Sequence, residues 1–239
     1  MRIIIDYSTN DPSLPLVDPA MALINDSVLG IWPMLSAGDS SGNGNNILFG
    51  GSFNGQGAVL ANDPGSILSL PVAEQDDMTF IACLNIAAPG AGNGAASLLG
   101  NLAPNAAPFE GFRASIQENG FVQLTAATGA TTPPVTNSSP TNISGAWTLR
   151  AFRFSNTAMQ HVTGAGVVTT TAISAGRAKS TRPIEFNGRS VASGASITRG
   201  LNGTLGFLAM YRSLLSDAEL IEKMGVVRSI MAGRGVIVP

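Results

Sequence analysis

Short hydrophobic runs, separated by clusters of Gly, Asn, Pro and Ser, follow one another from residue 28 to residue 212. The runs are roughly five to nine residues long and are rich in β-branched and aromatic side chains. This length and spacing are typical of the strands of a β-sandwich or a β-barrel. The pattern therefore predicts an all-β domain. The clearest runs are residues 78–86, 111–117, 121–127, 147–154, 183–189 and 203–212.

Two of these runs indicate how their strands lie in a sheet. The run 203–212 is apolar on both faces, which predicts a central strand. Regular alternation places four of its side chains on one face: Leu205, Phe207, Ala209 and Tyr211. The run 147–154 breaks the alternation, because Arg150 and Arg153 cannot both face solvent on a regular strand. We therefore predict a β-bulge in this strand.

One helix is predicted near the end of the chain, over residues 216–232. Ser216 and Glu219 have the spacing of a capping box, in which each side chain bonds the backbone N–H of the other residue. Hydrophobic residues then recur at helical spacing: Leu220, Met224, Val227 and Met231. Gly233 follows the last of them and is suited to end the helix. We expect the hydrophobic stripe to pack on the sandwich.

Residues 1–27 are predicted to form an N-terminal arm, with the sandwich domain spanning residues 28–239. The arm contains four Asp and three Pro residues, unlike the runs that follow. It also contains a short strand-like segment, Ile3, Ile4 and Ile5. A single strand has unpaired backbone groups and needs a sheet edge to join. We therefore expect Ile3–Ile5 to contact a neighbouring subunit, and the alternative partner is the chain's own segment 236–239.

The composition fits one globular β domain with an uneven charge distribution. Of the 239 residues, 44% are hydrophobic and 12% are charged, about half the usual charged share. Residues 1–112 carry one base and ten acids, whereas residues 113–239 carry twelve bases and five acids, so their net charges are −9 and +7. This asymmetry suits packing against copies or against a charged partner. Nucleic acid is not an expected partner, because no basic run contains interleaved aromatic residues.

Two uncharged stretches, residues 78–109 and 119–149, raise the question of a membrane span. Pro, Gly and Asn interrupt both, and neither holds the roughly 20 consecutive apolar residues of a spanning helix. The start of the chain lacks the apolar core of a signal peptide, so we expect synthesis in a host cytoplasm. The single Cys83 and single His161 exclude a Cys/His zinc site. Cys83 lies in a strand-like run and is expected to be buried.

Several segments carry a family resemblance in chain order. The strand IWPML at 31–35, followed by the turn DSSGNGNN at 39–46, is one of them. Another is the closing segment LNGTLGFLAMYRSLLSDAEL at 201–220, which joins a strand to a helix entry. The segments between them are SILSLP at 66–71, MTFIACLNI at 78–86, GAWTLRAFRF at 145–154 and PIEFNGR at 183–189. Together they resemble the concanavalin A-like, laminin-G-like jelly-roll family, a type common in bacterial surface proteins and phage virions.

The resemblance covers about residues 28–235, although the Trp that the family usually has in the segment matching 78–86 is absent. It implies a jelly-roll β-sandwich of two packed antiparallel sheets, with about six or seven strands in each.

Some enzymes on this fold cleave glycans, and retaining glycosidases need two carboxyl groups about 5 Å apart. The related glucanases carry a Glu-x-Asp-x-x-Glu run, which this sequence lacks. Its densest acidic cluster is Glu74, Asp76 and Asp77, in a loop before a strand, where a solvated turn is the expected role. We therefore predict a protein that is not an enzyme, with glycan hydrolysis as a remote alternative.

Calcium is the one cofactor to consider, because members of the family often bind it with oxygen ligands. Asp39, Asn43 and Asn45 supply such oxygens within one loop. The alternative interpretation is a tight turn, in which Asn and Gly tolerate left-handed backbone. The sequence does not distinguish the calcium site from the tight turn.

Glycan binding has two candidate sets of residues. Trp32 and Trp147 can stack on a sugar, but both match core positions of the family, where burial is expected. The densest basic segment can hold an anionic glycan or a neighbouring acidic surface, and a solvated loop is the alternative. Its four residues are Arg177, Lys179, Arg182 and Arg189.

The function expected from these observations is a non-enzymatic, lectin-like virion protein that binds host-surface glycan. It would belong to a phage tail fibre, baseplate or capsid appendage, exposed on the particle. Its other partners would be virion subunits, including copies of itself. The alternative is a purely structural protein of the same fold that decorates or cements a capsid or tail.

Overall fold

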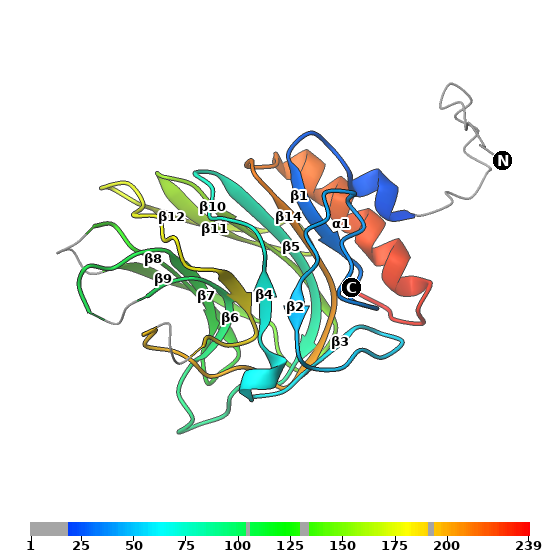
Figure 1. The fold of residues 1–239 in the computed structure, drawn as a ribbon, viewed down its shortest axis with the longest axis horizontal. Helices are drawn as coiled ribbons and strands as arrows, with labels where there is room; N and C mark the ends of the chain where they lie inside the picture. Colours follow the sequence, from blue (N-terminus) through cyan, green and yellow to red (C-terminus); the bar gives the residue numbers. More distant parts are fainter. Residues whose placement is uncertain (1–18, 104–105, 130–133, 191–193) are drawn as a thin grey trace.

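The computed structural model describes residues 19–103, 106–129, 134–190 and 194–239, and in these ranges the chain forms a β-sandwich of two antiparallel sheets (Figure 1). The prediction of an all-β jelly roll with one C-terminal helix is confirmed. Within the described ranges, each sheet has seven strands. No helix in the described ranges is long and apolar enough to cross a membrane.

One sheet carries the C-terminal helix on its outer face, and we call it the helix-covered sheet. Its strand order is β1-β14-β5-β10-β11-β12, and β3 pairs with β14 in addition. The strands are β1 (Val28–Trp32), β3 (Ala58–Leu60), β5 (Met78–Ile86), β10 (Thr148–Phe154), β11 (Ala158–Thr163), β12 (Val168–Ala172) and β14 (Gly203–Tyr211).

The other sheet, which we call the second sheet, has the order β2-β4-β13-β6-β7-β8-β9. Its strands are β2 (Leu48–Phe49), β4 (Leu68–Leu70), β6 (Ala96–Gly100), β7 (Phe112–Ile116), β8 (Phe121–Ala126), β9 (Val135–Asn142) and β13 (Ile184–Phe186). The described helices are η1 (Pro19–Leu23), η2 (Pro64–Ser66) and α1 (Asp217–Ala232).

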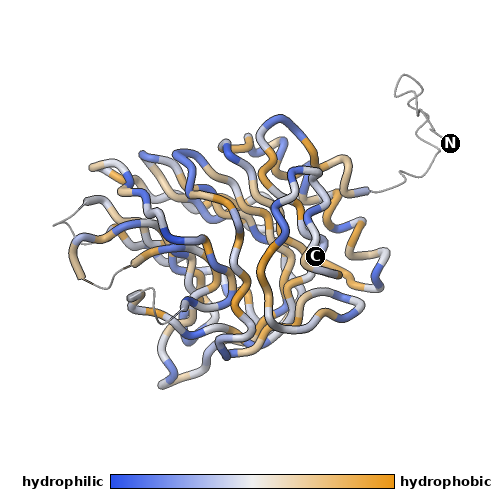
Figure 2. Tube along the Cα trace, viewed as in Figure 1, coloured by the Kyte–Doolittle hydropathy of each residue, from blue (hydrophilic) through white to orange (hydrophobic). Residues whose placement is uncertain are grey.

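The main hydrophobic core fills the space between the two sheets. At its centre, the ring centroids of Phe112 and Phe154 are 4.3 Å apart, and those of Phe80 and Phe112 are 5.7 Å apart. All three side chains are fully buried. Figure 2 shows hydrophobic positions along the strands and hydrophilic positions at many of the connecting loops. The sandwich is therefore held by burial of the inner faces of both sheets.

A second hydrophobic layer lies between α1 and the helix-covered sheet (Figure 1). The predicted capping box is present, because Ser216 and Glu219 each accept a hydrogen bond from the backbone N–H of the other. Gly233 is the C-cap, as expected. The predicted stripe is buried against the sheet: Leu220, Met224, Val227 and Met231.

The described end of the predicted N-terminal arm packs on this layer. The Tyr211 hydroxyl and the Lys223 ammonium both donate to the backbone carbonyl of Leu23, each at 3.0 Å. Leu23 itself is fully buried. Residues 19–23 are therefore part of the sandwich domain's own packing. The predicted strand Ile3–Ile5 lies outside the described residues.

The prediction of a β-bulge in residues 147–154 is wrong. β10 pairs with β5 and β11 in regular register, whereas β14 has an irregularity between Leu205 and Phe207. Because of this shift, Leu205 points into the core between the sheets, while Phe207 and the alternate residues after it face α1. The single-face alternation predicted for these residues is therefore wrong at Leu205. The prediction of a central strand is confirmed, because β14 pairs with both β1 and β5.

Arg150 and Arg153 are both buried, on opposite faces of the regular strand β10. Arg153 lies on the α1 side and pairs with Asp217 at the start of the helix, with 2.6 Å between Nη1 and Oδ1. Arg150 shares the inner face of the strand with Phe152. A bulge is unnecessary, because a helix on the outer face supplies a carboxylate to the arginine that faces it.

Candidate functional site

Polar side chains occupy the outer face of the second sheet, the face away from α1. In β7, Phe112, Ala114 and Ile116 point into the core, so Arg113 and Ser115 lie on the outer face. β8 follows the same alternation. The two outer faces of the sandwich therefore differ: one is apolar and covered by a helix, and the other is polar and crossed by loops.

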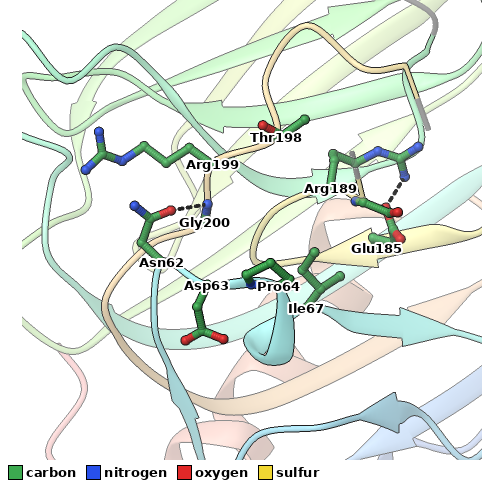
Figure 3. Close-up of a pocket in the computed structure, with 10 residues that line it drawn as sticks. Asn62, Asp63, Pro64, Ile67, Glu185, Arg189, Thr198, Arg199 and Gly200 are labelled. Carbon is green, nitrogen blue, oxygen red and sulfur yellow. Dashed lines mark hydrogen bonds and ion pairs between the residues drawn. The ribbon is translucent and has the colours of Figure 1, made fainter. Parts of the chain in front are cut away.

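An open hollow of about 530 Å³ lies beside this polar face, and we call it the loop hollow (Figure 3). Three segments line it: residues 62–67 around η2, residues 185–190 at the end of β13, and residues 198–200 before β14. Its lining includes carboxylate, amide, hydroxyl and guanidinium groups together with the apolar side chains of Pro64 and Ile67. A mixed lining of this kind can bind a ligand that has both hydroxyl groups and apolar C–H surface.

Side-chain hydrogen bonds hold the segments of the loop hollow together. The Asn62 side chain accepts from the backbone N–H of Gly200 at 3.0 Å. Asn187, which has a left-handed φ of 64°, donates to the carbonyl of Ala61 at 3.0 Å and accepts from the N–H of Leu201 at 2.7 Å. Asn tolerates this backbone conformation better than most residues. The walls are therefore fixed before any ligand enters.

The charged groups of the loop hollow are partly committed to the protein. Arg189 pairs with Glu185 at 2.9 Å and donates to the carbonyls of Gly100 and Pro183. Burial lowers the pKa of Arg189, and the Glu185 carboxylate opposes that shift. Among the described residues, the Arg199 side chain donates to the carbonyl of Asn93 at 2.8 Å. Figure 3 shows the guanidinium groups of Arg189 and Arg199 on opposite sides of the hollow, pointing away from each other.

The four basic residues predicted as a binding set do not gather at one site. Arg189 lines the loop hollow, whereas the side chain of Arg177 is fully buried and pairs with Glu74. Lys179 pairs with Asp76 at the surface, with 2.7 Å between Nζ and Oδ1. Arg182 is half-buried and does not line the loop hollow.

The expected solvated turn at Glu74 is wrong, because this carboxylate lies at the centre of a buried network. One oxygen pairs with Arg177, and the other accepts from the Asn101 amide at 2.7 Å and from the Ser180 N–H at 2.9 Å. Arg177 also donates to the carbonyls of Gln75 and Asp76. The network joins the loop before β5 to the segment before β13.

The loop proposed for calcium is a hydrogen-bonded turn. One Asp39 oxygen accepts from the N–H groups of Ile31 and Ser41, and the other accepts from the Ser41 hydroxyl and the Asn45 N–H. The side-chain amides of Asn43 and Asn45 donate to backbone carbonyls of β1. The described residues contain no group of three or more His, Cys, Asp or Glu placed to hold a metal ion. This geometry favours the tight-turn interpretation.

Trp32 and Trp147 both pack against hydrophobic residues of the domain's interior. Trp32 is fully buried, and its indole N–H donates to the carbonyl of Asn45 at 2.7 Å. Trp147 is half-buried and packs against the layer beneath α1. Neither side chain lines the loop hollow.

His161 is buried between the sheets. Its Nδ1 shares a hydrogen bond of 3.0 Å with the Ser139 hydroxyl, and its ring stacks on Phe152. Burial, with a smaller contribution from the Arg150 charge, lowers the pKa of His161 to about 3. The ring is therefore neutral at physiological pH.

This shift predicts a loss of stability in acid. Between about pH 6.5 and pH 3 the unfolded chain binds a proton at His161 that the folded chain does not bind, so the free energy of unfolding should fall as pH falls. The slope from this residue reaches at most about 1.4 kcal/mol per pH unit. Urea unfolding at several pH values, compared between the wild type and His161→Gln, measures it. Parallel curves for the two proteins would contradict the assignment.

Sequence reasoning missed most residues of the loop hollow, including Asn62, Asp63 and Thr198. A local signal was present for Asp63, because Asp-Pro-Gly is a turn sequence and its carboxylate caps η2 by accepting from the Ser66 N–H. No local signal joins residues 62–67 to the segment 198–200, because the two segments come together only in the tertiary fold.

The chain is similar to known proteins in structure but not in sequence. No protein family model matches the chain, and no curated protein sequence is similar to it. A botulinum neurotoxin type G receptor-binding domain aligns with a TM-score of 0.63 and 13% identity, over 84% of this chain and 52% of that domain. A binding domain of botulinum neurotoxin DC in complex with SialylT aligns with a TM-score of 0.59 and 11% identity, over 86% and 52%.

A smaller solved domain also aligns. The CBM40 of a Ruminococcus gnavus sialidase, bound to α2,3-sialyllactose, matches with a TM-score of 0.50 and 16% identity, over 63% of this chain and 83% of that domain. The chain spans about half the length of the toxin domains it matches. At these identities the comparisons show the fold: a β-sandwich that this chain shares with carbohydrate-binding domains.

Proposed function

We propose that this chain is a lectin-like module that binds a saccharide in the loop hollow without cleaving it. The observation that carries the proposal is the hollow itself, an open polar cavity of about 530 Å³ with walls fixed by hydrogen bonds. This volume is within the range of roughly 300–1,000 Å³ typical of small-molecule sites. Saccharide hydroxyls both donate and accept, so they suit a lining that offers carboxylate, amide and guanidinium groups.

Binding without hydrolysis is supported by the state of the two carboxylates that line the hollow. Asp63 caps η2, and Glu185 is paired with Arg189. A retaining glycosidase needs one carboxylate free to attack and one acid free to donate a proton. Both carboxylates here have structural partners that hold them as acceptors.

The finer proposal is a virion protein, exposed on a phage particle, that contacts host-surface glycan and packs with other virion subunits, including copies of itself. Its support is the sequence resemblance to a jelly-roll family common in phage virions. Among the similar structures, one is a receptor-binding domain of a botulinum neurotoxin, and the sialidase CBM40 is bound to sialyllactose. Cell entry of a third protein, botulinum neurotoxin type C, depends on interaction with two ganglioside molecules. The saccharide ligands of these proteins support the same class of ligand for this chain.

A glycan array with the full chain tests the proposal. We expect a saccharide to bind the wild type and to lose at least about tenfold in affinity with Thr198→Trp, which fills the hollow, and with Arg199→Ala, which removes a charged donor from its wall. The matched control is Arg212→Ala, because Arg212 also donates to one backbone carbonyl, that of Asp26, and lies outside the hollow. This control should bind as the wild type does.

Three results would contradict the proposal in whole or in part. An array with no bound saccharide for a wild-type protein of normal thermal stability would favour the structural alternative, a decoration or cement protein. Equal binding by the wild type and both hollow variants would place the saccharide elsewhere on the molecule. Release of reducing ends from a bound glycan would contradict the non-enzymatic part.

A further inference from the structure

One row of outer-face positions runs across the second sheet from the loop hollow. The strand register aligns Glu185 with Gly100, Gly100 with Arg113, Arg113 with Thr125, and Thr125 with Thr136. Glu185 and Arg113 are thus two strand spacings apart, about 10 Å. Gly100, which has no side chain, lies between them. The row brings a second charged group close to the loop hollow.

Arg113 lines a smaller hollow of about 210 Å³, which we call the Arg113 hollow. Its other polar lining consists of the hydroxyl groups of Thr125, Thr136 and Ser196. Its apolar walls are Leu102, Phe109 and Pro134. A guanidinium, three hydroxyls and an aromatic ring therefore line one space, which is smaller than the roughly 300–1,000 Å³ of a whole small-molecule site and suits a subsite.

The Arg113 guanidinium is buried but poorly satisfied. The residue is 8% exposed, and Nη1 donates to the Ser196 hydroxyl at 3.1 Å. Nε is buried and has no hydrogen-bond partner among the described residues. None of the ion pairs found in the described ranges includes Arg113.

The charge on Arg113 persists despite this environment. Burial, followed by repulsion from Arg189, lowers the pKa of Arg113 to about 10, so the side chain is still protonated at neutral pH. Glu185 is already paired with Arg189 and is not available to neutralise a second cation. A buried charge without a partner is costly, and removal of that cost favours an anion in the hollow.

We propose that the Arg113 hollow is a subsite for the carboxylate or sulfate group of an acidic sugar residue. This inference rests on the proposed saccharide-binding function and names the class of saccharide. A guanidinium binds such groups through two parallel N–H donors. The hydroxyls of Thr125 and Thr136 hydrogen-bond each other at 3.3 Å and line the same hollow, and Phe109 adds an apolar wall for the C–H face of the sugar.

Titration of the full chain with glucuronic acid, glucose and inorganic sulfate tests the subsite. Glucuronic acid and glucose differ in one carboxylate, so their comparison isolates the charged group. We expect glucuronic acid to bind the wild type at least tenfold more tightly than glucose. Arg113→Gln should abolish that preference, and Arg113→Lys, which keeps the charge without the fork, should restore part of it. The control Arg212→Gln removes an equal charge and should retain the full preference.

A second measurement uses the wild type alone, so its result does not depend on whether the variants fold. In the wild type, the Arg113 Nε–H resonance should shift when glucuronic acid is added and stay in place when glucose is added. If inorganic sulfate shifts the resonance and glucuronic acid does not, the ligand is a free inorganic anion and the saccharide assignment is overturned. An unchanged resonance with every compound would overturn the subsite.

Binding of the array saccharide to Arg113→Gln and Thr198→Trp distinguishes failure of the subsite from failure of the proposed function. If Arg113→Gln binds its array saccharide as the wild type does while Thr198→Trp does not, the loop hollow is a saccharide site and the Arg113 subsite is wrong. If neither variant changes binding, both proposals fail together.

Discussion

Replacement of Glu74 by alanine should lower the free energy of unfolding by about 3–5 kcal/mol, the usual cost of removing one partner from a buried ion pair. The side chains of Glu74 and Arg177 are both fully buried. Burial lowers the pKa of Arg177 to about 10, and the variant removes the carboxylate that faces this buried guanidinium. The Asn101 amide and the Ser180 N–H lose their acceptor at the same time. Urea unfolding at pH 7 measures the loss.

A surface pair close by in the sequence is the control. Lys179 and Asp76 also form an ion pair, but their side chains are 45% and 65% exposed. Asp76→Asn should therefore cost less than about 1 kcal/mol. A double replacement, Glu74→Leu with Arg177→Met, removes both buried charges and should recover much of the stability lost in Glu74→Ala. Similar losses for Glu74→Ala and Asp76→Asn would contradict the role of the buried network.

The second large effect is expected for Phe112→Ala, which should cost about 3–5 kcal/mol. Phe112 is fully buried between the sheets, in contact with the rings of Phe80 and Phe154, and the Arg177 guanidinium lies 5.8 Å from its ring centroid. Its removal leaves a cavity at the point where the core meets the ion pair. The midpoint and slope of urea unfolding report the change.

Phe53→Ala provides the comparison for this core variant. Phe53 also contacts another ring, that of Phe49 at 5.2 Å, but it is half-buried. Its loss should be clearly smaller than that of Phe112, because less hydrophobic surface returns to water. Equal losses would mean that the centre of the sandwich is less tightly packed than the ring contacts indicate.

The fold could be predicted from the sequence because its strands and its helix carry local signals. The capping box at Ser216 and the hydrophobic stripe after it define α1 from neighbouring residues alone. Alternation defined most strands, but it could not place the bulge of β14, where Leu205 changes face. The bulge depends on pairing with β5, more than a hundred residues earlier in the chain.

The candidate site was less predictable because its residues come together only in the tertiary structure. Arg177 and Arg189 are close to Lys179 and Arg182 in the sequence, which suggested one basic surface. Burial separates them: Arg177 faces a carboxylate from the loop before β5, and Arg189 faces Glu185 at the loop hollow. The charge of a segment is visible in the sequence, whereas the partner of each charge is a property of the fold.

Cys83 has a practical consequence for the experiments on both hollows. It is the one cysteine of the sequence, it is fully buried in β5, and burial raises the pKa of its thiol to about 12. Only thiolates react quickly with maleimide dyes, so the native protein should be inert to such labels. A cysteine introduced at an exposed position beside either hollow would therefore take a single fluorophore without prior removal of Cys83. Saccharide binding could then be followed from that one probe in an otherwise unaltered protein.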